Sequence, residues 1–378
     1  MLDKVWSGRG SIKYIGQIVK DFGGKRILLV TGKASYSNSG IQKYLDDETV
    51  GLSVLRYSDF DVNPKLEDLL QGAELTANFK PDIIIGIGGG SVMDTAKLLS
   101  VLPLQETQII DMITGFRHVA ERKIKLILIP TTAGSGSEAT HFAVAYIFKE
   151  KYSVASPFLL SDAIILDSSL TDSMGKQLTA VTAFDALSQA IESIWAVGST
   201  SESQKYAEDS LKIIIEIFDL LIKNPGEAER DKMLEASYLA GKAINISKTT
   251  APHAVSYELT TNYGIPHGLA VAITLGSIIK YNAEAPKTLY RNSDQYAELQ
   301  VRFFKIFQLL RVKNADEAAL KIEKMLIIAG LPTRLREIGM TSKDEIKILS
   351  SRINNQRMQN NPIMISNGEL VSLLELVY

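Results

Sequence analysis

The first half of the chain alternates short apolar runs with longer segments of helical periodicity. Runs rich in Ile, Leu and Val predict strands over residues 26–31, 52–57, 83–87, 125–130 and 163–167. A helix is expected over residues 63–79, with Asn63 as its cap and Pro64 at its first position. Residues 143–155 read as a β-hairpin. This alternation favours a parallel sheet with helices on both faces.

The second half carries helical periodicity, and no strand pattern of comparable strength occurs in it. Helices are expected over residues 183–195, 202–222, 227–244, 301–310 and 315–329. We therefore predict an α/β, Rossmann-like N-terminal domain with a parallel sheet over residues 1–170. An all-α C-terminal domain is expected over residues 171–378.

Three consecutive glycines follow one of the predicted strands. Gly88, Gly89 and Gly90 leave no Cβ where a ligand approaches the backbone, and Ser91 can cap a helix that opens at Val92. The free N–H groups of a helix start favour an anion, so this segment predicts a site for the diphosphate of a nucleotide or dinucleotide. Ser91 stands where the dinucleotide fingerprint has its third glycine, and a tight turn without a ligand fits the same residues.

Composition narrows the classes of partner. The chain has 378 residues, 46% apolar and 22% charged, which is enough for two domains with full cores. Its formal net charge of −2 argues against nucleic acid or an anionic membrane as a partner, and the absence of cysteine excludes disulfides. The N-terminus lacks the apolar core of a signal peptide, and charged residues interrupt the apolar helical segment 211–222. We expect a cytoplasmic protein without a membrane span.

Two of the four histidines lie in contexts that suit metal ligands. His253 follows a proline, and His267 follows a helix-breaking sequence at Gly264, where a chain reversal would bring both rings to one point. Asp185 and Gln189 are four residues apart on one face of an apolar helix. One carboxylate, two imidazoles and an amide oxygen suit Fe²⁺ or Zn²⁺. An aspartate paired with lysine and a hydrogen-bonded core histidine fit these residues as well.

In combination, four segments resemble the iron-containing (group III) alcohol dehydrogenases: residues 88–97, 130–140, 185–192 and the His253/Pro266-His267-Gly268 pair. The resemblance covers nearly the whole chain. It implies the two-domain, dehydroquinate synthase-like architecture, a coenzyme (NADPH or NADH), a divalent metal (Fe²⁺ or Zn²⁺) and metal-assisted reduction of a small aldehyde to an alcohol.

Carried over by motif, the resemblance implies roles for individual residues. The diphosphate would be held by Gly88, Gly89, Gly90 and Ser91. The nicotinamide side of the coenzyme would be lined by Asp94, Thr131, Thr132 and Ser135. The metal would be ligated by Asp185, Gln189, His253 and His267.

The chain departs from the family pattern at three places. Gln189 replaces the usual helical histidine, which predicts weaker metal binding or a different ion. Tyr257 replaces a frequent histidine and could relay a proton or simply pack. After the first strand, Gly32 replaces the aspartate of many NAD-preferring members, and Lys33 with Ser35 could meet a 2′-phosphate. This last departure favours NADPH, although Lys33 could instead point to solvent.

Within the family, residues 137–144, 246–253 and 360–362 look most like the members that reduce phosphonoacetaldehyde to 2-hydroxyethylphosphonate. Lys248 would hold the phosphonate as a point charge, with His141 and Arg357 as further donors. The alternatives are solvated side chains at these positions, a generic short-chain alcohol or lactaldehyde dehydrogenase, and a catalytically weak nucleotide-binding relative. We expect a homodimer that acts on a small anionic aldehyde.

Overall fold

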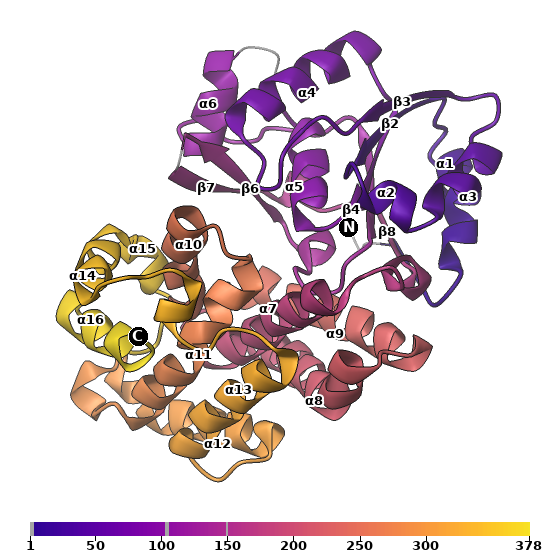
Figure 1. The fold of residues 1–378 in the computed structure, drawn as a ribbon. Coiled ribbons are helices and arrows are strands. Elements are labelled where there is room, and N and C mark those ends of the chain that lie inside the picture. Colours follow the sequence, from indigo (N-terminus) through magenta and orange to yellow (C-terminus); the bar gives the residue numbers. More distant parts are fainter. Residues whose placement is uncertain (1–3, 103–105, 149) are drawn as a thin grey trace. The chain divides into compact units, whose positions relative to one another are not determined.

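The computed structural model describes residues 4–102, 106–148 and 150–378, and the chain splits into two compact units, 1–174 and 175–378 (Figure 1). Unit 1 holds the parallel sheet and its helices. Unit 2 is helical. The fold class expected from the sequence is confirmed. The division falls between Met174 and Gly175, four residues after the predicted end of the N-terminal domain at residue 170.

Unit 1 is built on a six-stranded parallel sheet in the order β1-β8-β5-β4-β2-β3, with a separate antiparallel hairpin of β6 and β7. The strands are β1 (Lys4–Ser7), β2 (Arg26–Thr31), β3 (Ser53–Tyr57), β4 (Ile83–Gly88), β5 (Lys125–Pro130), β6 (Phe142–Ile147), β7 (Glu150–Ala155) and β8 (Ala163–Leu166). All five predicted strands and the hairpin are present. The short edge strand β1 escaped prediction because only two of its four residues, Val5 and Trp6, are apolar or aromatic.

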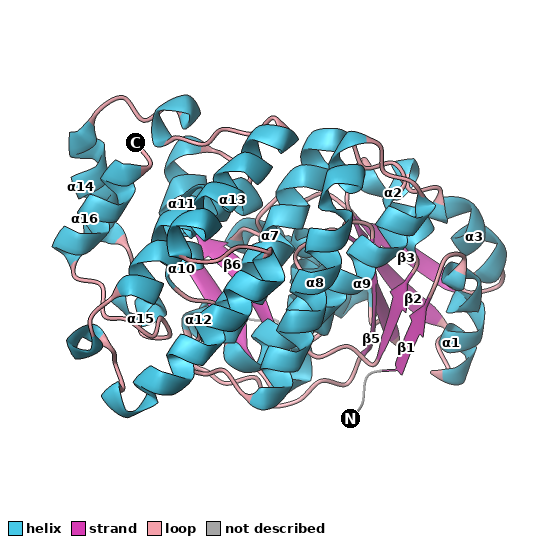
Figure 2. Ribbon diagram, turned by 90° about the horizontal axis from the view of Figure 1, so that it is seen from below, coloured by secondary structure: helices cyan, strands magenta, loops and turns pink. Residues whose placement is uncertain are grey.

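Helices cover both faces of this sheet, and Figure 2 shows α1, α2 and α3 beside its strands. Alternate strand residues point to opposite faces, so Leu28 and Ile84 pack toward α4, α5 and α6, whereas Ile27 and Ile85 pack toward α1 and α3. The helices of unit 1 are α1 (Ile15–Asp21), α2 (Ser35–Asn38), α3 (Ile41–Glu48), α4 (Leu66–Phe79), α5 (Gly90–Leu99) and α6 (Glu106–Thr114).

One predicted helix start in unit 1 was wrong. Helix α4 begins at Leu66 with Lys65 as its N-cap, and Asn63 adopts a left-handed φ of 66°. Asn63 therefore belongs to the turn before the helix, a conformation that asparagine tolerates better than most residues. The predicted end at Phe79 is confirmed.

The strand order creates a switch point between β2 and β4. From β2 the chain moves outward to β3, then returns to β4 on the other side of β2 and continues to β5. Thr31 pairs with Ile87, so the carboxyl ends of β2 and β4 are level with each other. Ligands of open parallel sheets bind outside the carboxyl ends of strands at such a point. The predicted coenzyme residues near Gly32 and Gly88 follow these two ends.

Unit 2 consists of helices that pack around α7 and α11. They are α7 (Lys176–Trp195), α8 (Ser201–Lys223), α9 (Glu227–Ser247), α10 (Ala251–Tyr263), α11 (His267–Glu284), α12 (Tyr296–Leu310), α13 (Ala315–Ala329), α14 (Lys343–Arg352), α15 (Asn355–Met358) and α16 (Asn367–Leu376). The five predicted helices are present. Helices α10 and α11 were not predicted from periodicity. Helix α11 is buried on most of its sides, so its apolar residues form no single stripe.

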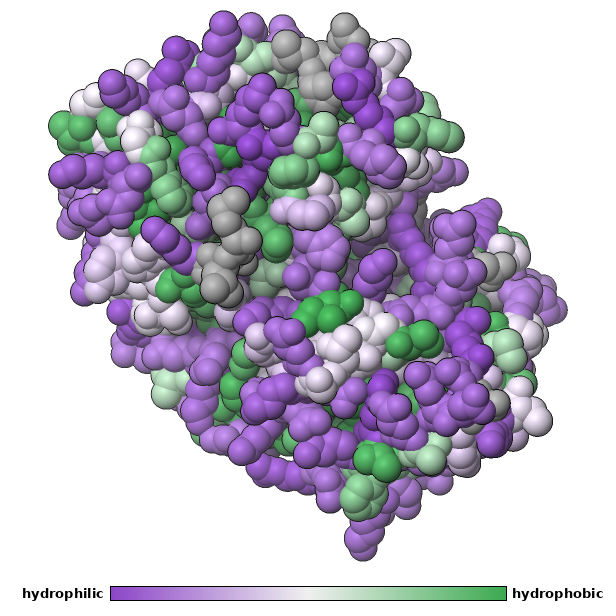
Figure 3. All heavy atoms as spheres, turned by 180° about the vertical axis from the view of Figure 1, so that it is seen from behind, coloured by the Kyte–Doolittle hydropathy of each residue, from purple (hydrophilic) through white to green (hydrophobic). Residues whose placement is uncertain are grey.

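No helix of the described ranges is long and apolar enough to cross a membrane. On the face drawn in Figure 3, hydrophobic residues occur in small groups among hydrophilic ones. Scattered apolar residues of this kind are normal on protein surfaces and mark no interface by themselves.

Candidate active site

Helix α7 supplies the carboxylate of the predicted metal site. Asp185 is 8% exposed, in a helix whose neighbouring residues are almost all buried. One turn later, the Gln189 amide nitrogen donates to Asp185 Oδ1 at 3.1 Å. The expected shared face of these two side chains is thus present. A role for Gln189 as a fourth metal ligand stays a prediction.

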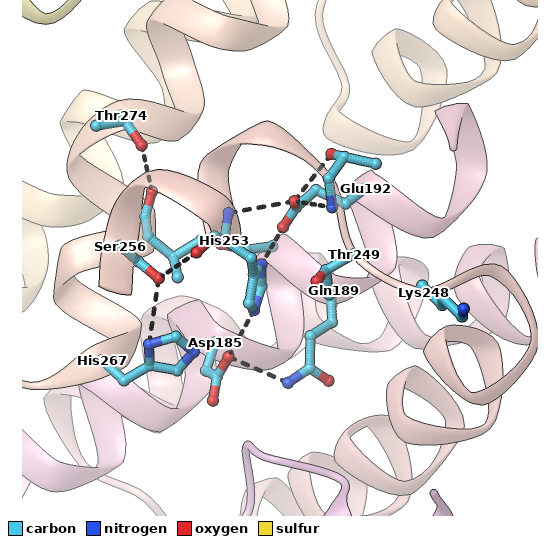
Figure 4. A network of polar contacts seen from close by, with 12 residues as sticks. Asp185, Gln189, Glu192, Lys248, Thr249, His253, Ser256, His267 and Thr274 are labelled. Atoms are coloured by element: carbon cyan, nitrogen blue, oxygen red, sulfur yellow. Dashed lines mark hydrogen bonds and ion pairs between the residues drawn. The ribbon is translucent and has the colours of Figure 1, made fainter. Parts of the chain in front are cut away.

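Helices α10 and α11 supply the two imidazoles, and the turn between them aims both rings at Asp185 (Figure 4). Gly264 ends α10 in the left-handed conformation, and His267 is the first residue of α11. The next residue, Gly268, lies against α7: a Cβ there would stand 1.9 Å from Val181 O. Glycine at 268 therefore permits the close helix approach that brings His267 to Asp185.

The three side chains form a compact cluster. Asp185, His253 and His267 each offer one ligand atom, and these atoms lie within 4.8 Å of one another. His253 Nε2 is 3.3 Å from Asp185 Oδ1, and the two imidazole rings are 5.3 Å apart between centroids. Two imidazoles and one carboxylate are a donor set that suits a divalent transition metal. The residues present therefore fit the expected ion.

Glu192, which the sequence analysis did not single out, holds His253 from behind. Its Oε2 is in close contact with His253 Nδ1, and its Oε1 accepts from Thr250 N at 2.8 Å and from Thr250 Oγ1 at 2.9 Å. The carboxylate is fully buried. Metal-ligating histidines commonly donate their second N–H to such a carboxylate, which fixes the tautomer and the ring orientation. His267 has Ser256 Oγ at 3.3 Å from its Nδ1.

The electrostatics of the cluster couple metal binding to proton release. Burial lowers the pKa of His253, but Glu192 and Asp185 together raise it to about 9. Burial raises the pKa of Asp185, but the hydrogen bond from His253 and the charge of His267 lower it below its ordinary value. His253 is therefore protonated at neutral pH without an ion, and a metal must displace that proton to use the ring as a ligand.

Replacing Glu192 with glutamine should weaken metal binding. The Glu192→Gln amide keeps the volume of the side chain but removes the negative charge behind His253. We expect metal affinity to fall about 10- to 100-fold, as is usual for partners of this kind. Competition with a chelator of known affinity measures the change. Glu202→Gln on the exposed start of α8 is the matched control, and equal affinities in the two variants would contradict the role of Glu192.

Tyr257 lies in a stack of three side chains beside the metal cluster. Its ring is parallel to that of His267, with centroids 5.7 Å apart and an interplanar angle of 4°, and Arg357 Cζ lies 4.4 Å from its centre. Burial raises the pKa of Tyr257 while Arg357 opposes the shift, so the hydroxyl stays protonated at neutral pH. Both alternatives from the sequence remain compatible with this position: the side chain packs, and it keeps a proton that it can donate.

In unit 1, the predicted diphosphate loop is present, but its cap differs from the prediction. Helix α5 begins at Gly90 with Gly89 as its N-cap, so Ser91 is not the cap. Ser91 Oγ instead accepts from Asn63 N at 3.0 Å. Val92 N in the first turn of α5 donates to Gly89 O at 3.0 Å, so the N–H groups of Gly90 and Ser91 are the ones that an anion could use there.

The loop after β5 packs tightly over these glycines. A Cβ at Gly89 would stand 3.3 Å from Thr132 Oγ1, and one at Gly90 would stand 3.1 Å from Ser135 Cβ and Oγ. The Thr131 hydroxyl is buried and has no hydrogen-bond partner within the described part of the chain. A backbone cradle with an orphaned hydroxyl beside it fits a bound coenzyme.

Both carboxylate oxygens of Asp94 accept hydrogen bonds from residues of unit 1. Its Oδ1 accepts from Ser137 Oγ at 2.5 Å, and its Oδ2 accepts from Val144 N at 3.0 Å. The fully buried Lys97 ammonium donates to Ser137 Oγ at 3.0 Å and to Thr140 Oγ1 at 2.9 Å. These contacts anchor the loop that carries Thr131 to Ser135. Direct coenzyme contact by Asp94 stays a prediction.

Arg56, which was not predicted as a site residue, adds a positive charge beside Lys33 at the end of β2. Lys33 is exposed and forms an ion pair with Asp59 at 3.0 Å, and Ser35 fills the space beside Gly32. Arg56, at the end of β3, donates to Thr31 Oγ1 at 2.8 Å. The signal that would have found Arg56 is its register in β3, one position before the strand end. A 2′-phosphate role for Lys33 and Ser35 stays a prediction.

The three predicted substrate residues fall in different places. His141 belongs to unit 1, where its ring packs edge-on against Phe142. Arg357, on α15, stacks on Tyr257 in unit 2. Lys248 is exposed at the corner between α9 and α10, across the drawn network from His267 (Figure 4). Its backbone has φ 61° and ψ 174°, a region that glycine favours and that costs other residues about 1–3 kcal/mol.

Comparisons with known proteins agree with this layout. Residues 3–168 match the family described as iron-containing alcohol dehydrogenase, and residues 179–378 match the C-terminal part of the Fe-containing alcohol dehydrogenase family. The chain belongs to the iron-containing alcohol dehydrogenases. Members of this family are oxidoreductases that bind NAD(P) and a divalent metal.

Two curated relatives and one solved structure illustrate the range of proteins to which this chain is similar. The bifunctional aldehyde-alcohol dehydrogenase of Escherichia coli is 31% identical over 90% of this chain, and the chain spans 41% of that enzyme. The phosphonoacetaldehyde reductase of Streptomyces viridochromogenes is 32% identical over 55% of each chain. The sulfoacetaldehyde reductase of Bifidobacterium kashiwanohense, solved with NAD⁺, has a TM-score of 0.87 at 28% identity over 99% of this chain and 96% of its own.

Proposed function

We propose that this protein uses NAD(P)H and a divalent metal to reduce a small anionic aldehyde, with phosphonoacetaldehyde as the expected substrate and 2-hydroxyethylphosphonate as the product. The observation that carries the enzymatic assignment is the Asp185–His253–His267 cluster, whose ligand atoms lie within 4.8 Å. A decayed, purely nucleotide-binding relative would have no reason to keep all three ligands and the buried Glu192 behind them.

The cluster and its neighbours divide the chemistry among themselves. The bound cation supplies a Lewis acid for the aldehyde oxygen, and the coenzyme supplies the hydride. Asp185, His253 and His267 would hold the cation, and Glu192 would orient His253. Tyr257, whose raised pKa keeps its hydroxyl protonated, can donate the proton that turns the reduced carbonyl oxygen into the hydroxyl of the product.

The anionic substrate is supported by two cations on the same unit as the cluster. Arg357 stacks on Tyr257, which stacks on His267, so a guanidinium lies two side chains away from a metal ligand. Lys248 is the C-cap of α9, and its N–H donates to Ile244 O at 2.9 Å. Two relatives are named for aldehydes that carry a phosphonate or a sulfonate, which agrees with a site for a small anion. A generic alcohol dehydrogenase remains the second candidate, because other relatives are named for simple alcohols.

A substrate panel tests the proposal directly. The metal-loaded protein is assayed by loss of NAD(P)H absorbance with phosphonoacetaldehyde, sulfoacetaldehyde, propanal and lactaldehyde, each with NADH and with NADPH. We expect kcat/KM for the anionic aldehydes to exceed that for propanal at least about tenfold, which corresponds to about 1.4 kcal/mol. We also expect kcat/KM to be higher with NADPH than with NADH. Higher values for propanal or lactaldehyde would favour the generic dehydrogenase, and no turnover in a metal-loaded sample would favour the non-catalytic relative.

Substituting Lys248 tests the anion site. In Lys248→Ala we expect KM for phosphonoacetaldehyde to rise about tenfold, because a charge-assisted contact worth about 1.4 kcal/mol is lost. KM for propanal should change less than about twofold. Lys347→Ala, on the exposed face of α14, is the matched control. Equal changes for both aldehydes would remove Lys248 as the anion-binding residue.

A further inference from the structure

The corner between α9 and α10 places a lysine where the backbone favours glycine. Lys248 follows the last residue of α9 with φ 61° and ψ 174°. This combination is nearly exclusive to glycine, because the Cβ of other residues crowds the backbone there. Its N–H still closes α9 by donating to Ile244 O at 2.9 Å, so the strain is confined to one residue. Surrounding contacts must hold such a conformation in place.

Asn360 supplies those contacts. Its amide nitrogen donates to Ser247 O at 2.8 Å and to Thr249 O at 2.9 Å, the carbonyls on either side of Lys248. Its side-chain oxygen accepts from Gly198 N at 3.0 Å. The asparagine amide thus pins the residue before the strained position and the residue after it, and no other side chain has this pair of donors on so short a stem.

Asn360 also links the corner between α9 and α10 to Arg357, the second cation of the proposed anion site. Arg357 lies three residues earlier in the same segment, and its guanidinium covers the Tyr257 ring. Thr249, next to Lys248, hydrogen-bonds the Tyr257 side chain. Two sets of contacts therefore connect Lys248 with Arg357. The first runs through Asn360, which binds the carbonyls beside Lys248 and follows Arg357 by three residues. The second runs through Thr249 and Tyr257, whose ring Arg357 covers.

We propose that Asn360 is a positioning residue for substrate choice: it holds Lys248 in the strained conformation, so that the ammonium of Lys248 and the guanidinium of Arg357 are presented together to the anionic group of the aldehyde. The inference rests on the proposed function and adds to it the reason for a lysine at a glycine position. The three hydrogen bonds of the Asn360 side chain to described residues go to backbone groups, so its effect on the substrate passes through Lys248.

A thermal comparison tests the strain without using activity. Lys248→Gly and Lys248→Ala both remove the ammonium, but only glycine adopts φ 61°, ψ 174° without crowding. We expect Lys248→Gly to melt about 2–4 °C above Lys248→Ala, the reverse of the order usual near a helix end that ordinary residues tolerate. An alanine variant as stable as the glycine variant, or more stable, overturns the strained conformation and with it the role of Asn360.

A kinetic cycle tests the positioning. The metal-loaded Asn360→Ala variant should show a KM ratio, phosphonoacetaldehyde over propanal, about five- to tenfold above that of the unmodified protein. In the Lys248→Ala background the same substitution should leave the ratio unchanged. Asn360→Ser provides a second variant, and Asn262→Ala, on an exposed turn of α10, is the matched control. Metal content and melting temperature are recorded for each.

The outcomes separate the two proposals. If Lys248→Ala leaves the KM ratio unchanged, the anion-binding role of Lys248 fails, and the role of Asn360 fails with it. If Lys248→Ala raises the ratio but Asn360→Ala and Asn360→Ser do not, the proposed function stands and the positioning role is overturned. An equal effect of Asn360→Ala with and without Lys248 also overturns it.

Discussion

The Asp185→Ala variant should lose both bound metal and turnover. Asp185 supplies the negative charge of the ligand set, and its carboxylate is buried beside His253. We expect kcat/KM to fall about a thousandfold or more, which corresponds to about 4 kcal/mol. Metal analysis of the purified variant should find little ion. In Asp185→Asn, which keeps the shape of the side chain and loses its charge, both kcat/KM and metal content should also decrease.

Two measurements keep this result interpretable. Asp209→Ala, on an exposed turn of α8 where Asp209 pairs with Lys205, is the matched control and should keep its metal and its activity. Circular dichroism should show unchanged helix content in Asp185→Ala. A variant with unchanged metal content and full turnover would show that Asp185 is no ligand, and the proposed function would lose its basis.

The Gly268→Ala variant should separate His267 from the cluster. The added Cβ would stand 1.9 Å from Val181 O, and a backbone oxygen in a packed helix cannot move aside as a flexible side chain can. Helix α11 must therefore shift away from α7. We expect an unfolding free energy lower by about 1–3 kcal/mol. Metal affinity should be lower by at least about tenfold, because a ligand leaves its place.

Gly368→Ala is the matched control for this substitution. It makes the same change in the same unit, in the first turn of α16, where nothing lies within 4 Å of the added Cβ. Its stability should stay equal or rise slightly, since alanine is the better helix former. If Gly268→Ala bound metal as tightly as Gly368→Ala, the close approach of α11 and α7 would not be what places His267.

Much of the fold could be read from local patterns, because the strands of unit 1 are continuous apolar runs. Strand β5 and helix α13 have the predicted bounds. Helices α10 and α11 escaped prediction, since burial on several sides leaves no apolar stripe to recognise. Ser91 was assigned as a helix cap because serine is a good cap, but Gly89 takes that place and α5 begins two residues earlier than expected.

In the site, too, contacts within one helix could be predicted from the sequence, whereas contacts between helices depend on the tertiary structure. Asp185 and Gln189 share a helix, so their spacing predicted their contact. Glu192 lies seven residues after Asp185, two turns along the same face, and that spacing could have revealed it. The meeting of His253 and His267 depends on the turn at Gly264 and the bare backbone at Gly268. The strained backbone at Lys248 could not be predicted, because the residue types around it do not indicate it.

The candidate metal ligands Asp185, His253 and His267, with Glu192 behind His253, all come from unit 2, whereas the predicted diphosphate loop with its three glycines belongs to unit 1. Selection can therefore act on the choice of ion and on the choice of coenzyme through separate sets of codons. An engineer could exchange one preference without redesigning the other. Diversification of such an enzyme would then proceed by independent steps, each tolerated before the next arises.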